Sequence, residues 1–452
     1  MAVFECLFRR SIADVANRNL TTVKSGIVLS VVIAFAIWSK SKAGGGRSAR
    51  DRETALGSDS VGLARLKSYA CGVQVAWTEE PSVDMAAASI AAALDRSDIG
   101  QLLVFFSPSR LGSALSRALS HEFAGIPVAG CSTSGQIFPD HFSEVGILAM
   151  AFPKKGFRVV SKVFRDIHGL SIERAIEIVR DLRAQLDQGS GAKKRNRFAL
   201  SFIDGLSNSE EMIVSALGCA LNDIPLVGGS AGDNLLLART ALLHNGEVYH
   251  EAALLLLIET DHLVRTFKHD NFEPTDQKLV VTESNSERRT VLELNAECAA
   301  REYASAAGLD DDSLTPMSFA ANPVVVRVGG DYYCRSIQKM NPDGSLTFFC
   351  AIDDGVVLTV ARARDMVSSA EKELDRLDRE TGGLDFVLAF DCVLRRLDSE
   401  IHQVKHRMCE LYKKYNLVGF HTYGEQYNSM HLNQTLTGVA IGPKSASHVH
   451  RS

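Results

Sequence analysis

The sequence predicts an α/β protein of two domains, in which helices cover mixed β-sheets built from a repeated strand-helix-strand-loop-strand unit. Three observations predict this fold. The chain has 452 residues, so at roughly 150 residues per domain it holds two or three domains. Its 46% hydrophobic and 23% charged residues are the balance of a globular protein with a sizeable core. One pattern of elements also occurs three times along the chain.

The first copy of the unit covers residues 102–136. It begins with the apolar strand LLVFF and continues with a stretch whose leucines recur at helical spacing. The short strand IPVAG then leads into the polar loop CSTSGQ at 131–136. The second copy, residues 198–234, repeats this order. Its strand FALSFI precedes a helix that opens at Ser209, and the strand IPLVG leads into the loop GSAGDN at 229–234.

The third copy lies near the end of the chain. The strand FVLAF leads into one long helix, expected from Cys392 to about Tyr415, and the loop FHTYGEQ at 420–426 follows. Strand-helix-strand crossovers predict parallel neighbours, and the extended segments after each loop predict antiparallel strands. Between the second and third copies, residues 323–353 predict a β-meander with a hairpin turn at Asn-Pro-Asp-Gly.

The expected domain limits are 65–260 and 261–443, with a short tail at 444–452. Residues 1–60 are expected to be an apolar segment followed by a flexible linker rich in Gly, Ser and Arg. The apolar run 26–38 is shorter than the roughly 20 residues that a spanning helix needs. Three interpretations stay open for it: weak membrane association, an uncleaved signal-like segment, or an extension outside the fold.

Cysteine usage and charge restrict the compartment and the partners. The nine cysteines form no Cys-x-x-Cys pair, which argues against a disulfide framework or a zinc ribbon and favours a reducing, cytoplasmic compartment. The net charge of -5 and the short basic runs predict no nucleic-acid partner.

The three polar loops predict a ligand site. They follow equivalent strands, and α/β folds bind ligands at the ends of buried strands. The alternative is that their glycines only permit tight turns. Short hydroxyls, carboxylates and amides in these loops suit a small zwitterion such as an amino acid. The candidate contacts are Cys131, Ser132, Ser230, Asp233, Tyr423, Glu425 and Asn433.

Enzymatic chemistry finds little support in the motifs. Residues 228–232 read Gly-Gly-Ser-Ala-Gly, which fits the nucleophile elbow of a serine hydrolase with Ser230 as nucleophile. The elbow needs a helix directly after it, but Asp233-Asn234 and then strand-like sequence follow. A Walker A loop and a Gly-x-Gly-x-x-Gly motif are both missing from the sequence. We therefore expect a protein that is not an enzyme.

The stretches IPVAGCSTSGQI, DGLSNSEEMI, IPLVGGSAGDN and TYGEQYNSMHLNQTLTGVAIG resemble the FIST N and FIST C domains, over about residues 68–442. The segments RSIQKMNPDGSLTFFCAIDDGVVLT and FDCVLRRLDSE resemble the bacterial NosP branch in particular. This resemblance implies haem b, nitric-oxide sensing and control of a partner histidine kinase. FIST domains also occur in other signalling proteins, which leaves a haem-free module for a small molecule or a protein partner as the alternative.

A haem sensor needs a strong axial ligand, and imidazole is the usual one. Three of the thirteen histidines are best placed. His431 lies in the segment that best matches the family and is the first candidate for iron ligation. His421 lies inside the third polar loop, and His269 lies near the expected domain junction. Each could instead be a hydrogen-bonded structural histidine. Cys131 and Cys350 compete only if a thiolate is stabilised there.

Overall fold

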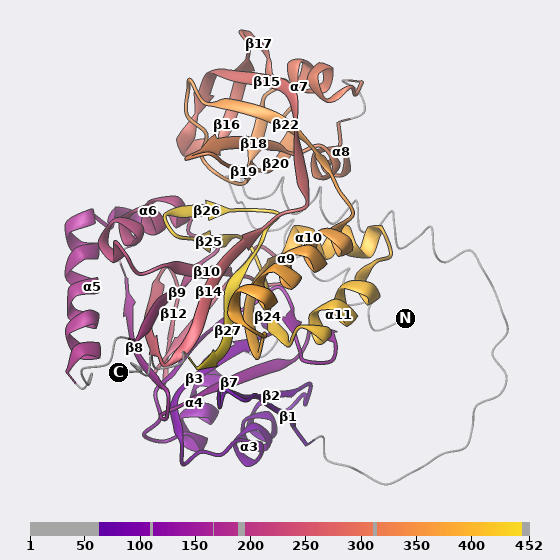
Figure 1. Cartoon of the computed structure of the whole chain (residues 1–452). Coiled ribbons are helices and arrows are strands. Elements are labelled where there is room, and N and C mark those ends of the chain that lie inside the picture. Colours follow the sequence, from indigo (N-terminus) through magenta and orange to yellow (C-terminus); the bar gives the residue numbers. More distant parts are fainter. Residues whose placement is uncertain (1–62, 109–111, 166, 189–194, 311–313, 445–452) are drawn as a thin grey trace, which may run out of the picture. The chain divides into compact units, whose positions relative to one another are not determined.

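The computed structural model describes residues 63–108, 112–165, 167–188, 195–310 and 314–444, and it confirms the mixed α/β fold class (Figure 1). The apolar run 26–38, its linker and residues 445–452 lie outside the described residues. Across the part of the chain that the structure describes, no helix is both long enough and apolar enough to cross a membrane.

The first predicted unit forms a sheet of parallel and antiparallel strands. β3 (Ile99–Phe106) pairs in parallel with β4 (Val128–Ser132), and α4 (Gly112–Glu122) makes the crossover between them. On the other side of β3 lies antiparallel β7 (Ile147–Pro153), followed by β2 (Gln74–Thr78). The edge strand β1 pairs with β2 at Arg65–Ser68.

The second unit repeats this arrangement strand for strand. β9 (Asn196–Asp204) pairs in parallel with β10 (Leu226–Ala231) through the crossover helix α6 (Glu210–Leu221). Antiparallel β13 (Ala253–Thr260) lies on the other side of β9, followed by β8 (Phe157–Phe164). The predicted repeat is therefore a repeat of topology as well as of sequence pattern.

The third unit has the same strand order but a different crossover. β23 (Phe386–Cys392) lies between parallel β24 (Leu417–Thr422) and antiparallel β27 (Leu436–Lys444), and β14 (His262–His269) follows β27. The single long helix expected here was wrong. The crossover consists of two helices, α10 (Val393–Ile401) and α11 (Lys405–Lys414), because Gln403 between them adopts a left-handed backbone with a φ of +58°.

A short hairpin follows the second parallel strand of each unit and joins the sheet of another unit. β5–β6 from the first unit extends the third sheet beside β24, β11–β12 from the second extends the first sheet beside β4, and β25–β26 from the third extends the second sheet beside β10. Their bounds are β5 (Gln136–Ile137), β6 (Phe142–Ser143), β11 (Leu242–His244), β12 (Glu247–Tyr249), β25 (Glu425–Tyr427) and β26 (Met430–Leu432). The three units thus exchange hairpins in a closed cycle.

One glycine occupies the same register position in all three units. Gly130, Gly228 and Gly419 each lie opposite a residue of the parallel first strand of their unit. A Cβ atom at these positions would lie 1.9, 2.1 and 1.8 Å from the carbonyl oxygen of that residue. The recurring glycine after the Ile-Pro or Leu-Val segment is therefore required by close packing of the two strands.

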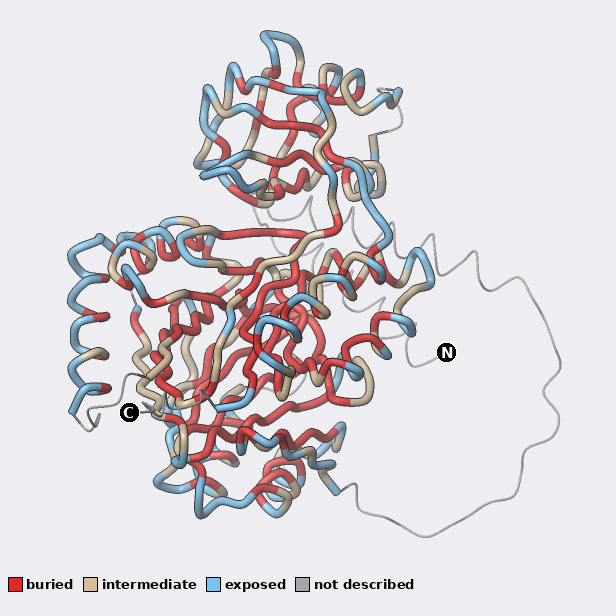
Figure 2. The backbone as a smooth tube through the Cα atoms, in the orientation of Figure 1, coloured by how far each residue is buried: buried red, intermediate tan, exposed pale blue. Residues whose placement is uncertain are grey.

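Helices cover the outer face of each sheet (Figure 1). α3 (Val83–Ala93) and α4 pack on the first sheet, α5 (Ile172–Asp187) and α6 on the second, and α9 (Met366–Thr381) with α11 on the third. Figure 2 shows burial following the strands, while α5 alternates between a buried and an exposed face. Ser82 and Ser171 cap α3 and α5 with side-chain hydrogen bonds, as the start signals of amphipathic helices predict.

The inner faces of the three sheets meet in one apolar core. Phe105, Phe202 and Phe390 occupy equivalent positions in the first strand of each unit, one residue after the partner of the recurring glycine. The ring centroids of Phe105 and Phe202 are 5.4 Å apart, and those of Phe202 and Phe390 are 5.9 Å apart, both edge to face. The same residue type in each unit therefore builds the shared centre.

Residues 272–363 form a further antiparallel sheet. The single meander expected over 323–353 was wrong: Val324–Val328 and Asp331–Arg335 form one hairpin, Ile337–Met340 and Leu346–Phe348 form another, and the two hairpins lie at opposite ends of this sheet. The turn at Asn341 closes through backbone hydrogen bonds to Ser345 and from Gly344. Its elements are β15 (Phe272–Asn285), β16 (Thr290–Leu294), β17 (Glu297–Cys298), α7 (Ala299–Ala307), α8 (Pro316–Ala321), β18 (Val324–Val328), β19 (Asp331–Arg335), β20 (Ile337–Met340), β21 (Leu346–Phe348) and β22 (Val357–Ala363). The domain limits near residue 260 stay a prediction, and two of the sheets contain strands from both sides of that position.

Candidate functional site

The three polar loops come together in the fold. They are residues 131–136, 229–234 and 420–426, and together they are called the loop cluster below. Each pair of loops shares a backbone hydrogen bond: Gly232 N to Ser132 O (3.0 Å), Ser134 N to His421 O (2.9 Å) and Ser230 N to Gly424 O (2.8 Å). The exchange of hairpins brings the loops together, because the first and third hairpins begin within their polar loops and the second begins at Leu242, shortly after its loop.

Two glycines of the loop cluster are there for close approach. A Cβ atom on Gly232 would lie 2.2 Å from the Ser134 hydroxyl oxygen, and one on Gly424 would lie 2.2 Å from the His431 ring. Neither glycine has a positive φ, whereas Gly135 does, at +120°. Tight turns alone therefore do not explain these glycines, since two of them let polar side chains pack against bare backbone.

Several predicted contact residues already have partners inside the protein. The Ser132 hydroxyl accepts a hydrogen bond from the Ala241 amide (3.0 Å), and the Ser230 hydroxyl accepts one from the Gln426 side-chain amide (3.0 Å). Ser230 lies within strand β10 and is fully buried. A hydrolase nucleophile would lie at an exposed strand-to-helix turn, so this geometry does not supply the elbow.

Asp233 and Tyr423 fix the second loop. The Asp233 carboxylate accepts hydrogen bonds from the backbone amides of residues 237–239 and from the Tyr423 hydroxyl. Cys131 is fully buried in β4, and burial raises the pKa of its thiol well above the ordinary value. It is therefore a neutral apolar side chain and not a thiolate ligand.

Glu425 and Asn433 have spare hydrogen-bonding capacity. One Glu425 carboxyl oxygen accepts from the Thr435 amide (3.1 Å) and hydroxyl (2.7 Å), and the other has no partner among the described residues. Burial raises the pKa of Glu425 well above its usual range, which favours the protonated acid. Asn433 donates to the Tyr423 carbonyl (3.3 Å), but its own side-chain oxygen finds no donor within the described structure.

A buried charged network adjoins the third loop. Asp391 is the second-last residue of β23, and Arg395 lies four residues further along the chain, in α10. The Arg395 Nε donates to Asp391 Oδ1 (2.7 Å), and the Tyr412 hydroxyl donates to Asp391 Oδ2 (2.9 Å). Burial raises the pKa of Asp391, and the Arg395 guanidinium opposes that effect. Sequence reasoning missed this network, although Asp391 and Arg395 have the i, i+4 spacing of a helical ion pair.

His421 lies between this network and the loop cluster. Its Nδ1 is 3.9 Å from Asp391 Oδ2, too far for a hydrogen bond, and the edge-to-face contact with Phe142 has a centroid distance of 5.3 Å. Burial lowers the pKa of His421 well below its ordinary value, and the nearby Arg396 adds to the effect. The imidazole is therefore neutral. Neither ring nitrogen finds a partner in the described part of the chain, and the same holds for the Ser134 hydroxyl.

The other two candidate histidines lie elsewhere. His431 is buried in β26, against Gly424 and near Glu211, Glu210, Arg289 and Arg335. His269 ends β14, and burial lowers its pKa to about 3. Both imidazoles are neutral and have one nitrogen without a partner among the described residues, which fits the protonation state of an iron ligand. The surroundings of His431 fit haem less well, since charged groups lie around this histidine where a haem site would have an apolar slot.

The buried His269 makes a prediction about pH. The folded-state pKa is about 3 and the unfolded value about 6.5, so the unfolded chain binds the extra proton and stability falls as the pH drops below 6.5. A His269→Gln variant cannot titrate at this position. Between pH 7 and pH 5, wild type should lose about 2 kcal/mol more unfolding free energy than this variant, as measured by chemical denaturation. His121→Gln, which changes an exposed ring, is the control and should track wild type.

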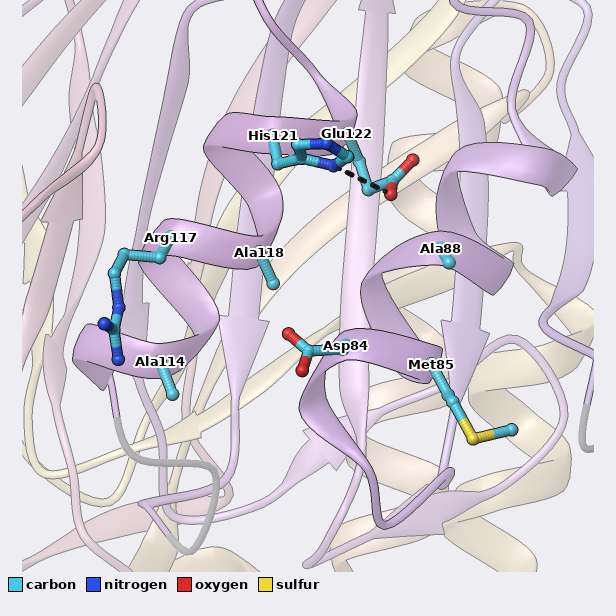
Figure 3. Close-up of a pocket in the computed structure, with 8 residues that line it drawn as sticks. All are labelled: Asp84, Met85, Ala88, Ala114, Arg117, Ala118, His121 and Glu122. Atoms are coloured by element: carbon cyan, nitrogen blue, oxygen red, sulfur yellow. Dashed lines mark hydrogen bonds and ion pairs between the residues drawn. The ribbon is translucent and has the colours of Figure 1, made fainter.

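A surface groove lies apart from the loop cluster. It runs between α3 and α4, has a volume of about 770 Å³, and is flanked by small side chains such as Ala88, Ala114 and Ala118 (Figure 3). Its polar residues include His121 and Glu122, which form an exposed pair at 3.2 Å. No described residue of the loop cluster lines it, so the groove does not belong to the candidate site.

Within the described residues, no three His, Cys, Asp or Glu side chains come together as a metal site. The fold and the loop cluster define an α/β protein made of three units that exchange hairpins, with a candidate ligand site where their polar loops meet. Residues 101–297 match the FIST N domain, and residues 299–428 match the FIST C domain. The chain therefore carries a FIST N and a FIST C domain, and FIST domains are associated with sensing of small ligands in signal transduction. No curated protein matches the chain in sequence.

Proposed function

We propose that this chain is a cytoplasmic signalling sensor that binds a small polar ligand at the loop cluster and is not an enzyme. The observation that carries the proposal is a set of buried polar atoms without partners among the described residues: Ser134 Oγ, both ring nitrogens of His421, and Glu425 Oε1. Buried polar groups in folded proteins are nearly always hydrogen-bonded, to protein, water or ligand. Polar atoms left over where three loops meet therefore support a polar ligand at this place.

The chemistry of these groups suits an amino-acid-like molecule. A neutral imidazole both donates and accepts, a hydroxyl does the same, and a protonated Glu425 donates through its acid hydrogen. Arg395 and Arg396 next to His421 supply positive charge for an anionic group. Such a site would read hydrogen-bonding pattern and charge, which is what distinguishes small metabolites from one another. Binding would be passed on to a signalling partner, for which a histidine kinase is the first candidate.

Haem with nitric-oxide sensing is the second candidate function. The observation that favours it is the neutral, buried imidazole of His431, with one nitrogen free of partners among the described residues. Haem would supply an iron that coordinates diatomic gases, with His431 as ligand and His421 or His269 as alternatives. The charged groups around His431 weigh against it.

Thermal unfolding with a panel of amino acids and small carboxylates tests the first proposal. A ligand present at about 100 times its Kd stabilises the folded protein by about 2.7 kcal/mol, so at least one probe should raise the Tm of wild type clearly. The His421→Gln variant should lose that shift, whereas the exposed control His121→Gln should keep it. Equal shifts in both variants would contradict a site at His421. Uptake of haem with a Soret band that His431→Ala removes would favour the second candidate.

A further inference from the structure

A carboxylate of the protein itself is bound beside the loop cluster. Glu144 follows the hairpin strand β6, and its carboxylate lies 3.2 Å from Arg396 Nη1 and accepts a hydrogen bond from Asn234 Nδ2 at 3.0 Å. The Asn234 side-chain oxygen in turn accepts from Arg396 Nη2 at 3.1 Å. Arg396 comes from α10 and Asn234 from the second polar loop. Together they form a fork that holds one carboxylate.

The two partners of this ion pair differ in burial. The Arg396 side chain is 4% exposed, while the Glu144 side chain is 44% exposed. A buried guanidinium needs a compensating anion, since an unpaired buried charge is costly. A half-exposed carboxylate loses little when it returns to water. The buried cation is therefore the permanent part of the site, and the anion is the exchangeable part.

The fork adjoins the partnerless atoms of His421. A Cβ atom on Gly135 would lie 3.3 Å from Arg396 Nη1, from the His421 ring and from the Ser143 carbonyl oxygen, so both side chains pack against the bare backbone of Gly135. Gly135 also has a φ of +120°, which favours glycine over other residues. Arg396 and His421 thus both lie against Gly135, and Arg396 also holds the Asn234 side chain.

We propose that Glu144 stands in for the carboxylate of the ligand when no ligand is bound. The ligand's carboxylate binds Arg396 and Asn234, and Glu144 moves out into solvent. The β5–β6 hairpin moves with Glu144, because Glu144 directly follows β6. Phe142 on the same hairpin contacts the His421 ring, so the motion also changes the surroundings of that ring. Since β5 pairs with β24, this motion reaches the strand that precedes the third loop. The inference rests on the proposed sensor function and adds to it the carboxylate class of the ligand and the group that competes with it.

Calorimetric titration of the full chain with acetate, glycine and L-glutamate tests this inference, with acetamide and glycinamide as the matched uncharged probes. Glu144→Gln removes the internal competitor's charge and should bind the best carboxylate probe at least tenfold more tightly than wild type. Arg396→Gln should abolish binding. Glu273→Gln is the matched control, because Glu273 is also an exposed carboxylate paired with an arginine, Arg364, at 2.8 Å. It should bind as wild type does.

Three outcomes separate the inference from the proposed function. If wild type binds a probe and Glu144→Gln binds it with unchanged affinity, Glu144 is no competitor and the inference fails, while the sensor site stands. If the uncharged probes bind as tightly as the carboxylates, the carboxylate class is wrong. If neither wild type nor Glu144→Gln binds any probe at millimolar concentration, the proposed ligand site at the loop cluster fails as well. Glu144→Gln changes a half-exposed side chain, so the test does not depend on whether Arg396→Gln folds.

Discussion

Replacement of Arg395 by methionine is expected to lower the free energy of unfolding by about 3–5 kcal/mol, the range for breaking a buried ion pair from one side. Arg395 is 2% exposed, and its Nε donates to Asp391, while its Nη1 donates to the Asn271 side chain at 2.7 Å. Methionine fills much of the same volume but leaves the Asp391 carboxyl buried without its cation. Urea denaturation of wild type and variant at pH 7 measures the difference.

The control for this prediction is Arg376→Met. Arg376 pairs with Glu373 and Glu380, but it is 45% exposed, so its loss should change stability by about 0–1 kcal/mol. The double variant Asp391→Asn/Arg395→Met removes both charges and should regain part of the lost stability. A loss below about 1 kcal/mol for Arg395→Met alone would show that the network is solvated, contrary to its burial here.

Replacement of Phe202 by alanine is expected to destabilise the fold by about 3–5 kcal/mol. Phe202 is fully buried and lies among Phe105, Phe390 and Phe420, each from a strand of another unit. Removing its ring leaves a cavity where all three sheets meet, and the surrounding strands cannot collapse into it without breaking their pairing. The measurement is the midpoint and slope of chemical denaturation, compared with wild type.

Phe202→Leu separates volume from aromatic contact. Leucine keeps most of the apolar volume and loses only the edge-to-face contacts, which are worth about 0.5–1.5 kcal/mol beyond burial. The leucine variant should therefore be clearly more stable than the alanine variant. Equal and small losses for both would contradict a tightly packed centre shared by the three units.

The order of elements in each unit was predictable because it is local. Strand, helix, strand and loop differ in hydrophobic periodicity, and the Ile-Pro and Gly-rich segments mark the boundaries. The exchange of hairpins was not predictable, because a strand as short as Gln136–Ile137 carries no signal that says which edge it joins. The break at Gln403 was missed for a related reason. Nothing in the local sequence pattern marks Gln403 as a left-handed residue between two helices.

The candidate site was predictable in position and less so in its residues. The loops were identified by their composition, and His421 was among the candidate residues. Ser132, Ser230 and Asp233 were also candidates, but their hydrogen-bonding groups are engaged by Ala241, by Gln426 and by the amides of residues 237–239. A sequence does not say which polar groups pair internally, since those partners lie on other strands and loops.

Residues that approach the site from other elements were missed altogether. Arg396 lies in a helix and Glu144 in a turn after a two-residue strand, and neither position carries a motif. The i, i+4 pair of Asp391 and Arg395 was visible in the sequence but is equally typical of a solvent-exposed helix face. The pair differs from a surface ion pair because both side chains are buried. That burial depends on how the third sheet packs with its neighbours, which the local sequence does not show.

The most direct test of the central claim is the nitrogen NMR spectrum of the protein with ¹⁵N-labelled histidine, recorded during titration with the probe that raises the Tm. Signals of His421 are assigned by their loss in the His421→Gln variant. The account predicts that Nδ1 and Nε2 of His421 shift on binding, because both are neutral, buried and without partners among the described residues. Saturable binding that shifts other histidines and leaves both His421 nitrogens unchanged would contradict a ligand site at the loop cluster.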